Sequence, residues 1–66
     1  MLPVVKHFLH EKGFTVRDLT ERLWAKGVII HHETVKGYCR AWSREYGKPE
    51  IWEKIFECLR EMEVIT

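Results

Sequence analysis

Hydrophobic residues recur every three or four positions along this sequence, which is the spacing that gathers them on one face of an α-helix. The pattern predicts four helices, separated by glycines that suit helix ends. Pro3 fits the first turn of the first helix, and Gly13 ends it. The apolar stripe of this helix consists of Val4, Val5, Phe8 and Leu9.

The second helix has the clearest start signal. Thr15 can cap the backbone amide of Asp18 while the Asp18 side chain reaches back, which is an aspartate version of the capping box. Gly27 is a natural left-handed terminator. We therefore expect a helix from about Val16 to Lys26. Its inward face is made of Val16, Leu19 and Leu23, with Trp24 at the edge.

A third helix is expected after a short apolar connector. It begins near His31 or His32 and continues toward Glu45 or Tyr46, before Gly47 stops it. Residues at helical spacing define its inward face, which is Val35, Tyr38, Cys39 and Trp42. Its outward face is polar and partly cationic and consists of His31, His32, Glu33, Lys36, Gly37, Arg40 and Arg44.

A fourth helix is expected to begin at Lys48 and Pro49. Its apolar face is broad and consists of Ile51, Trp52, Ile55, Phe56, Leu59 and Met62. Because that face is wider than one small partner helix needs, we expect Trp52, Phe56 and Leu59 to form a homodimer interface.

The last apolar residues, Val64 and Ile65, fit two interpretations. They could form a short strand that pairs across a two-fold axis, or a tail that anchors the end of the chain. We favour the tail.

The stretch Thr15–Trp42, about 28 of the 66 residues, resembles the helix-turn-helix regulators of transcription, because two helices flank a compact connection. Leu23, Gly27, Ile30, Thr34 and Val35 form a run that is similar to the DNA-binding half of the bacterial arginine repressors. The short all-helical chain, with a helix after this pair, is similar to the Cro and repressor class of phages and mobile elements. The resemblance implies an all-α, four-helix domain, residues 1–66, that contains a helix-turn-helix and acts as a repressor.

The resemblance also implies that the third helix enters the major groove of double-stranded DNA. The first residues of such a recognition helix contact base edges, and flanking side chains meet phosphates. The outward set from His31 to Arg44 is therefore the predicted DNA-binding site. A glycine inside a helix costs roughly 1 kcal/mol relative to alanine, and close approach of the backbone to another surface is one reason to tolerate Gly37.

An ordinary solvated helix face remains the simpler interpretation of the same residues. The His31, His32 and Glu33 cluster fits a capped helix start as well as it fits a contact with DNA. Lys36, Arg40 and Arg44 fit a charged surface as well as phosphate binding.

The net charge of +1 speaks against binding to nucleic acid, but the charges are unevenly distributed. Residues 1–48 contain nine Lys or Arg against five Asp or Glu, a balance of +4. Residues 49–66 contain two against five, a balance of −3. A basic half that reads DNA and an acidic end that faces elsewhere would account for both numbers.

Several other functions are not expected. The sequence has no nucleophile elbow and no phosphate loop, and a short helical domain offers little concave space for an enzyme active site or a small-molecule ligand. His7 and His10 lack further metal ligands, so we expect no metal or cofactor. Cys39 and Cys58 fit buried faces. Without a long apolar run, we expect a soluble cytoplasmic protein and no membrane span.

The serious alternative is a protein-interaction module, such as an anti-repressor or adaptor with the same fold that does not bind DNA. Such a module would dock through Trp52, Phe56 and their neighbours. The two functions differ in salt dependence, because only phosphate contacts release counterions.

Overall fold

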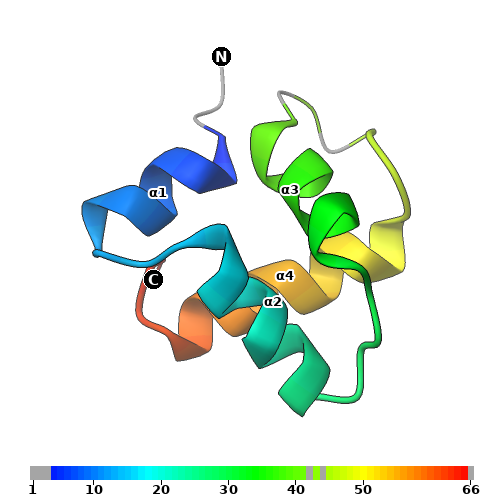
Figure 1. Ribbon diagram of the computed structural model, residues 1–66. Helices are drawn as coiled ribbons and strands as arrows, with labels where there is room; N and C mark the ends of the chain where they lie inside the picture. Colours follow the sequence, from blue (N-terminus) through cyan, green and yellow to red (C-terminus); the bar gives the residue numbers. More distant parts are fainter. Residues whose placement is uncertain (1–3, 42, 44, 66) are drawn as a thin grey trace.

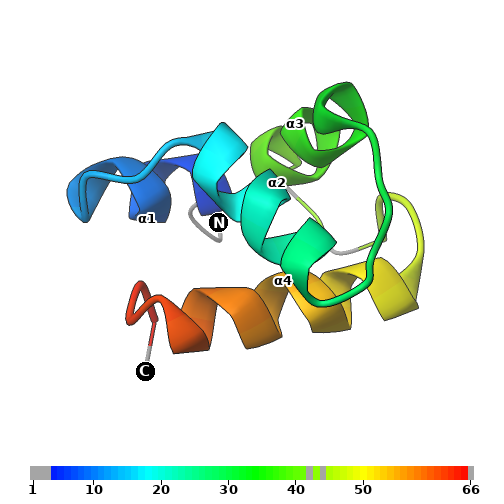
Figure 2. The same ribbon diagram turned by 60° about the horizontal axis from the view of Figure 1, so that its bottom comes forward.

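The computed structural model describes residues 4–41, 43 and 45–65, and within them it contains four helices and no strand. The helices are α1 (Val5–Glu11), α2 (Val16–Ala25), α3 (His32–Arg40) and α4 (Pro49–Glu61). The predicted all-α fold is confirmed. α2 packs against both α3 and α4, and α1 packs against α3 (Figure 1). Figure 2 shows α4 running beneath the other three helices, on the side of the molecule away from α3.

Both ends of α2 follow the local rules expected from its sequence. The Thr15 amide donates to the Asp18 carboxylate at 2.8 Å, and the Asp18 amide donates to the Thr15 hydroxyl at 3.2 Å. At the other end Gly27 has a φ of 86°, and the Val28 amide donates back to the Leu23 carbonyl at 2.9 Å. These bonds satisfy backbone groups that a helix end leaves free.

Trp24 lies outside the inward face of α2, with 42% of its surface exposed. Its indole N–H donates to the Ile30 carbonyl at 2.7 Å. This bond ties the last turn of α2 to the end of the connection, so it helps to fix the point from which α3 starts.

The expectation that α3 continues to Glu45 or Tyr46 is wrong. The helix ends at Arg40, and Ala41 is extended, with a ψ of 135°. The chain turns here so that the Tyr46 ring packs edge to face on Tyr38, with 5.1 Å between ring centres. The long-range packing therefore overrides a local sequence that would tolerate more helix.

The loop after α3 is also tied to α4. The Trp52 indole N–H donates to the Tyr46 carbonyl at 2.6 Å, and the Lys48 amide donates to the Tyr38 hydroxyl at 2.8 Å. Gly47, with a φ of 68°, lies against the Tyr38 ring, so a side chain there would meet both strain and a clash. Pro3 and Trp42, which the sequence assigns to helices, lie outside the described residues.

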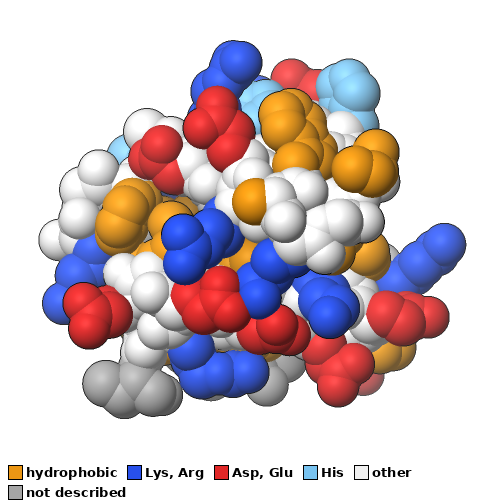
Figure 3. All heavy atoms as spheres, turned by 90° about the horizontal axis from the view of Figure 1, so that it is seen from below, with side chains coloured by type: hydrophobic (Ala, Val, Ile, Leu, Met, Phe, Trp, Pro, Cys, Tyr) orange, Lys and Arg blue, Asp and Glu red, His pale blue; other side chains and the backbone are white. Residues whose placement is uncertain are grey.

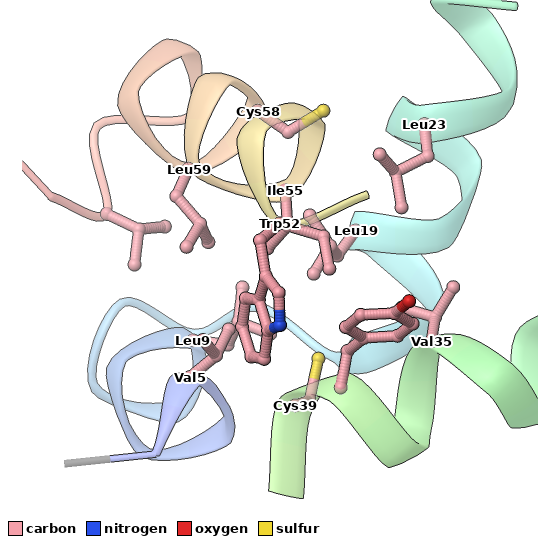
Figure 4. Close-up of a cluster of buried hydrophobic side chains, with 12 residues drawn as sticks. Val5, Leu9, Leu19, Leu23, Val35, Cys39, Trp52, Ile55, Cys58 and Leu59 are labelled. Atoms are coloured by element: carbon pink, nitrogen blue, oxygen red, sulfur yellow. The ribbon is translucent and has the colours of Figure 1, made fainter. Parts of the chain in front are cut away.

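The four helices enclose one hydrophobic core (Figure 4). Its buried members are Val5, Leu9, Leu19, Leu23, Val35, Tyr38, Cys39, Trp52, Ile55, Cys58, Leu59 and Val64. Among the described residues Thr20 is the one buried polar residue, and its hydroxyl donates to the Val16 carbonyl at 2.9 Å. The sequence pattern gives no sign that this threonine is buried.

The broad apolar face of α4 is largely used inside the chain. Trp52 is 6% exposed and Leu59 is fully buried, while Phe56 is half-buried and stacks on Trp52 with 5.9 Å between ring centres. Of the three residues expected at a homodimer interface, Trp52 and Leu59 therefore belong to the core of the chain, and Phe56 stays partly exposed. No helix in the described part of the chain has the length and apolarity needed to cross a membrane.

The end of the chain folds back as an anchoring tail. Val64 is 6% exposed, and its amide donates to the Leu59 carbonyl at 2.9 Å. To make this turn Glu63 adopts a φ of 60°, in the left-handed region that disfavours residues with a Cβ.

Replacing Glu63 by glycine should therefore stabilise the protein by about 1 kcal/mol, because glycine removes the Cβ clash of the left-handed conformation. Urea unfolding monitored by circular dichroism measures the change. Glu63→Ala, which keeps the Cβ, is the matched control and should show no such gain. Equal midpoints for the two variants would argue against the left-handed turn.

An ion-pair network joins α2 to α4. The Lys26 ammonium lies 2.7 Å from the Glu57 carboxylate and 2.6 Å from that of Glu61, and Arg22 lies 3.4 Å from Glu61. Figure 3 shows basic and acidic side chains alternating across the middle of the face seen from below. Hydrogen bonds to Glu57 and Glu61 raise the pKa of Lys26, and the hydrogen bond from Lys26 lowers the pKa of each glutamate.

This network should make stability depend on pH in the acid range. Because the folded-state pKa values of Glu57 and Glu61 lie below the unfolded value of about 4.3, their contribution is complete above about pH 5 and is lost as the pH falls through the lowered values. In Lys26→Met, the melting temperature should fall less between pH 7 and pH 3 than in the wild type. Lys54→Met is the control, since Lys54 pairs with Glu57 at a longer 3.7 Å. A Lys26→Met variant with the wild-type acid profile would refute the assignment.

Candidate nucleic-acid interface

His31 caps the start of α3. Its Nδ1 accepts a hydrogen bond from the Glu33 amide at 3.1 Å, and Glu33 stands in the first turn, where a carboxylate suits the positive end of the helix. The sequence left capping and DNA contact open for this cluster. The structure shows the capping, and His31 and Glu33 also remain exposed.

Three outward residues of α3, spaced four apart, line a shallow hollow between α1, the start of α2 and α3. These are His32, Lys36 and Arg40. The hollow is completed by Lys6 from α1 and by the first residues of α2. Its full lining in the described part of the chain is Lys6, Thr15, Val16, Arg17, His32, Lys36 and Arg40.

Sequence reasoning does not single out Lys6 and Arg17, although both are on the polar faces of their own helices. Each looks like an ordinary solvated cation in a linear sequence. Only the packing of α1 and α2 against α3 brings them beside Lys36 and Arg40.

Positive charge dominates this hollow. None of its described lining residues is acidic. Lys36 pairs with Glu33 at 3.4 Å and Arg17 with Glu21 at 3.5 Å, but both glutamates are more than half exposed, and such surface pairs hold their partners weakly. Arg40 forms no ion pair with any residue that the structure describes.

The start of α2 also borders the hollow. Thr15 and Val16, at the start of that helix, line the hollow, and a helix N-terminus carries roughly half a positive charge. The Asp18 carboxylate already accepts the Thr15 amide at this helix end, so the attraction of the hollow for anionic oxygens comes from the cations of three helices.

Gly37 lies on the same helix and is only partly exposed. The Tyr46 side chain covers it: a Cβ added to Gly37 would meet the Tyr46 hydroxyl and would lie 3.2 Å from the ring carbon that carries it. The close approach that this glycine permits is thus to a residue of its own chain. Arg44, the last of the predicted contacts, lies outside the described residues.

The acidic residues of α4 are kept apart from the hollow. No residue of α4 lines it, and α4 lies on the other side of the domain (Figure 2). Glu57 and Glu61 are paired with cations of α2. The modest net charge of the chain thus conceals a positively charged surface on one side.

The cysteines offer no reactive group. Burial raises the pKa of the Cys39 thiol to about 12, and burial also raises the pKa of Cys58. A thiol reacts through its thiolate, so neither is prepared for nucleophilic chemistry. Among the described residues, no three His, Cys, Asp or Glu side chains gather in a way that could hold a metal ion.

Both thiols should resist modification in the folded protein. At pH 8 and in native buffer, a disulfide reagent such as DTNB should label neither Cys39 nor Cys58 at an appreciable rate, and labelling should become complete in urea. Rapid native labelling of Cys39, checked with a Cys58→Ala variant, would show that the core is more open than the structure indicates.

The chain matches no protein-family model, no curated protein and no solved structure. The functional argument therefore starts from the geometry of the hollow and of α3.

Proposed function

We propose that this protein binds double-stranded DNA through α3 and the cationic hollow beside it, and that it acts as a transcriptional regulator of the repressor type. The observation that carries the proposal is the gathering of Lys6, Arg17, Lys36 and Arg40 from three helices around one hollow without a carboxylate in its described lining. Phosphate contacts supply most of the affinity of proteins for DNA, and cations with helix ends supply those contacts.

The two parts of the surface have different roles in this proposal. The exposed start of α3, with His31 and Glu33, meets base edges in the major groove, which is wide enough to admit a helix. Lys6 and Arg17 stand beside α3 on other helices, and they meet the phosphates that border the groove. α2 and α3 with their short connection form the helix-turn-helix of the proposal.

A single copy of the chain is the binding unit in this proposal. α4 lies on the side away from α3 (Figure 2), so a two-fold dimer through the outer face of α4 would turn its two α3 helices in opposite directions. Such a dimer could not place both on one face of a duplex. A homodimer that reads two half-sites about 34 Å apart would need another contact surface.

The test is a salt titration of binding to a short random duplex, followed by fluorescence anisotropy. The wild type should lose affinity steeply with salt, and Lys36→Ala with Arg40→Ala should abolish binding at moderate salt while the far-UV circular dichroism stays intact. Lys6→Ala with Arg17→Ala should lower the slope of log affinity against log salt by up to about 1.8, because each lost phosphate contact removes about 0.9.

The matched control is Lys54→Ala with Arg60→Ala, which removes the same charge from α4, away from the hollow. This variant should bind DNA nearly as the wild type does. If the α4 variant loses as much affinity as the α3 variant, net charge and not the hollow drives binding, and the proposal fails.

A protein-interaction module is the second candidate, and a groove along the outer side of α4 favours it. Pro49, Phe56 and Ile65 give the groove an apolar floor, while Glu53 and Arg60 stand among its charged lining. A partner docked there would bind with little dependence on salt. Absence of any DNA binding at low salt would favour this candidate over the first.

A further inference from the structure

The loop between α3 and α4 places the Tyr46 side chain against α3 at Gly37, the position where the helix has no side chain of its own. Gly37 follows Glu33 by four positions and precedes Arg40 by three, so it lies between them on the outward face of the helix. The Tyr46 hydroxyl occupies the space in which a side chain of residue 37 would begin. The outward face therefore contains a phenol that belongs to a different segment of the chain.

Tyr46 is held in this position by the core. Its ring packs edge to face on the buried Tyr38, with 5.1 Å between ring centres, and its carbonyl accepts the Trp52 indole N–H at 2.6 Å. Its own amide donates to the Ser43 carbonyl at 3.3 Å. Contacts of this kind fix a side chain before any ligand arrives, which lowers the entropy lost on binding.

The Tyr46 hydroxyl is not used in a hydrogen bond within the described part of the chain. Tyr46 is 47% exposed, and its hydroxyl has no hydrogen-bond partner among the residues that the structure describes. Tyr38 is the internal comparison, since it is 4% exposed and its hydroxyl accepts the Lys48 amide. The Tyr38 hydroxyl is therefore used inside the fold, whereas the Tyr46 hydroxyl lies beside α3.

We propose that Tyr46 is part of the recognition surface and hydrogen-bonds through its hydroxyl to the DNA in contact with α3. This inference rests on the proposed function. It also explains why α3 contains a glycine at position 37. Gly37 weakens the helix by roughly 1 kcal/mol, but only glycine leaves room for the Tyr46 phenol. A tyrosine hydroxyl both donates and accepts, so it suits a phosphate oxygen or a base edge.

The experiment compares Tyr46→Phe with Tyr38→Phe in the full chain, using a duplex to which the wild type binds. Tyr46→Phe removes only a hydroxyl that makes no hydrogen bond to the described residues, so its melting temperature should stay at the wild-type value while its affinity falls by about three- to tenfold. Because the hydroxyl is uncharged, the salt slope should not change. Tyr38→Phe should lower the melting temperature and leave the affinity of the folded protein unchanged.

Failure of this inference is distinguishable from failure of the proposed function. If the wild type binds the duplex with a steep salt dependence and Tyr46→Phe binds equally well, Tyr46 is not a contact although the protein is a DNA reader. If Tyr46→Phe lowers the melting temperature as well as the affinity, the Tyr46 hydroxyl stabilises the fold. The inference is then also rejected.

Discussion

The structure depends on how α3 buries one side. Val35 and Cys39 are fully buried and Tyr38 nearly so, which leaves the helix no freedom to rotate about its axis without exposing them. Because these three residues pack in the core, His32 and Arg40 lie toward α1 and the start of α2. The cationic hollow is thus a consequence of hydrophobic packing on the adjacent side of the same helix. In a chain of 66 residues the core is small, so each of these contacts matters to the fold as well as to the site.

Three aromatic residues connect the core to the surface. Tyr38 packs on Trp52 and on Tyr46, with 5.1 Å between ring centres in each pair. Such edge-to-face pairs, together with the two hydrogen bonds to Tyr46 and Lys48, hold the described part of the loop between α3 and α4. The same loop sets the end of α3 and covers Gly37. Stability and the shape of the proposed recognition surface are therefore produced by one cluster.

The sequence predicts those features that depend on neighbouring residues. The capping box of Thr15 and Asp18 and the glycine end of α2 are local bonds, and the structure has both. The end of α3 is not predictable in this way, because the loop that follows it packs on Tyr38 and accepts a hydrogen bond from Trp52, and the local sequence gives no signal for these contacts. The hollow is not predictable either: Lys6 and Arg17 join it through the arrangement of three helices, for which single-helix periodicity gives no signal. The burial of Trp52 and Leu59 is not predictable for a related reason, because a broad apolar face on one helix can be covered within the same chain.

The central claim is that DNA meets the side of the domain formed by α3, α1 and the start of α2. The most direct measurement is an NMR titration of the ¹⁵N-labelled protein with a short duplex, with each amide assigned. We expect the largest shift changes at Lys6, Arg17 and along α3 from His32 to Arg40, with little change on the outer side of α4. Changes concentrated on α4, or none at a duplex excess in low salt, would contradict the account.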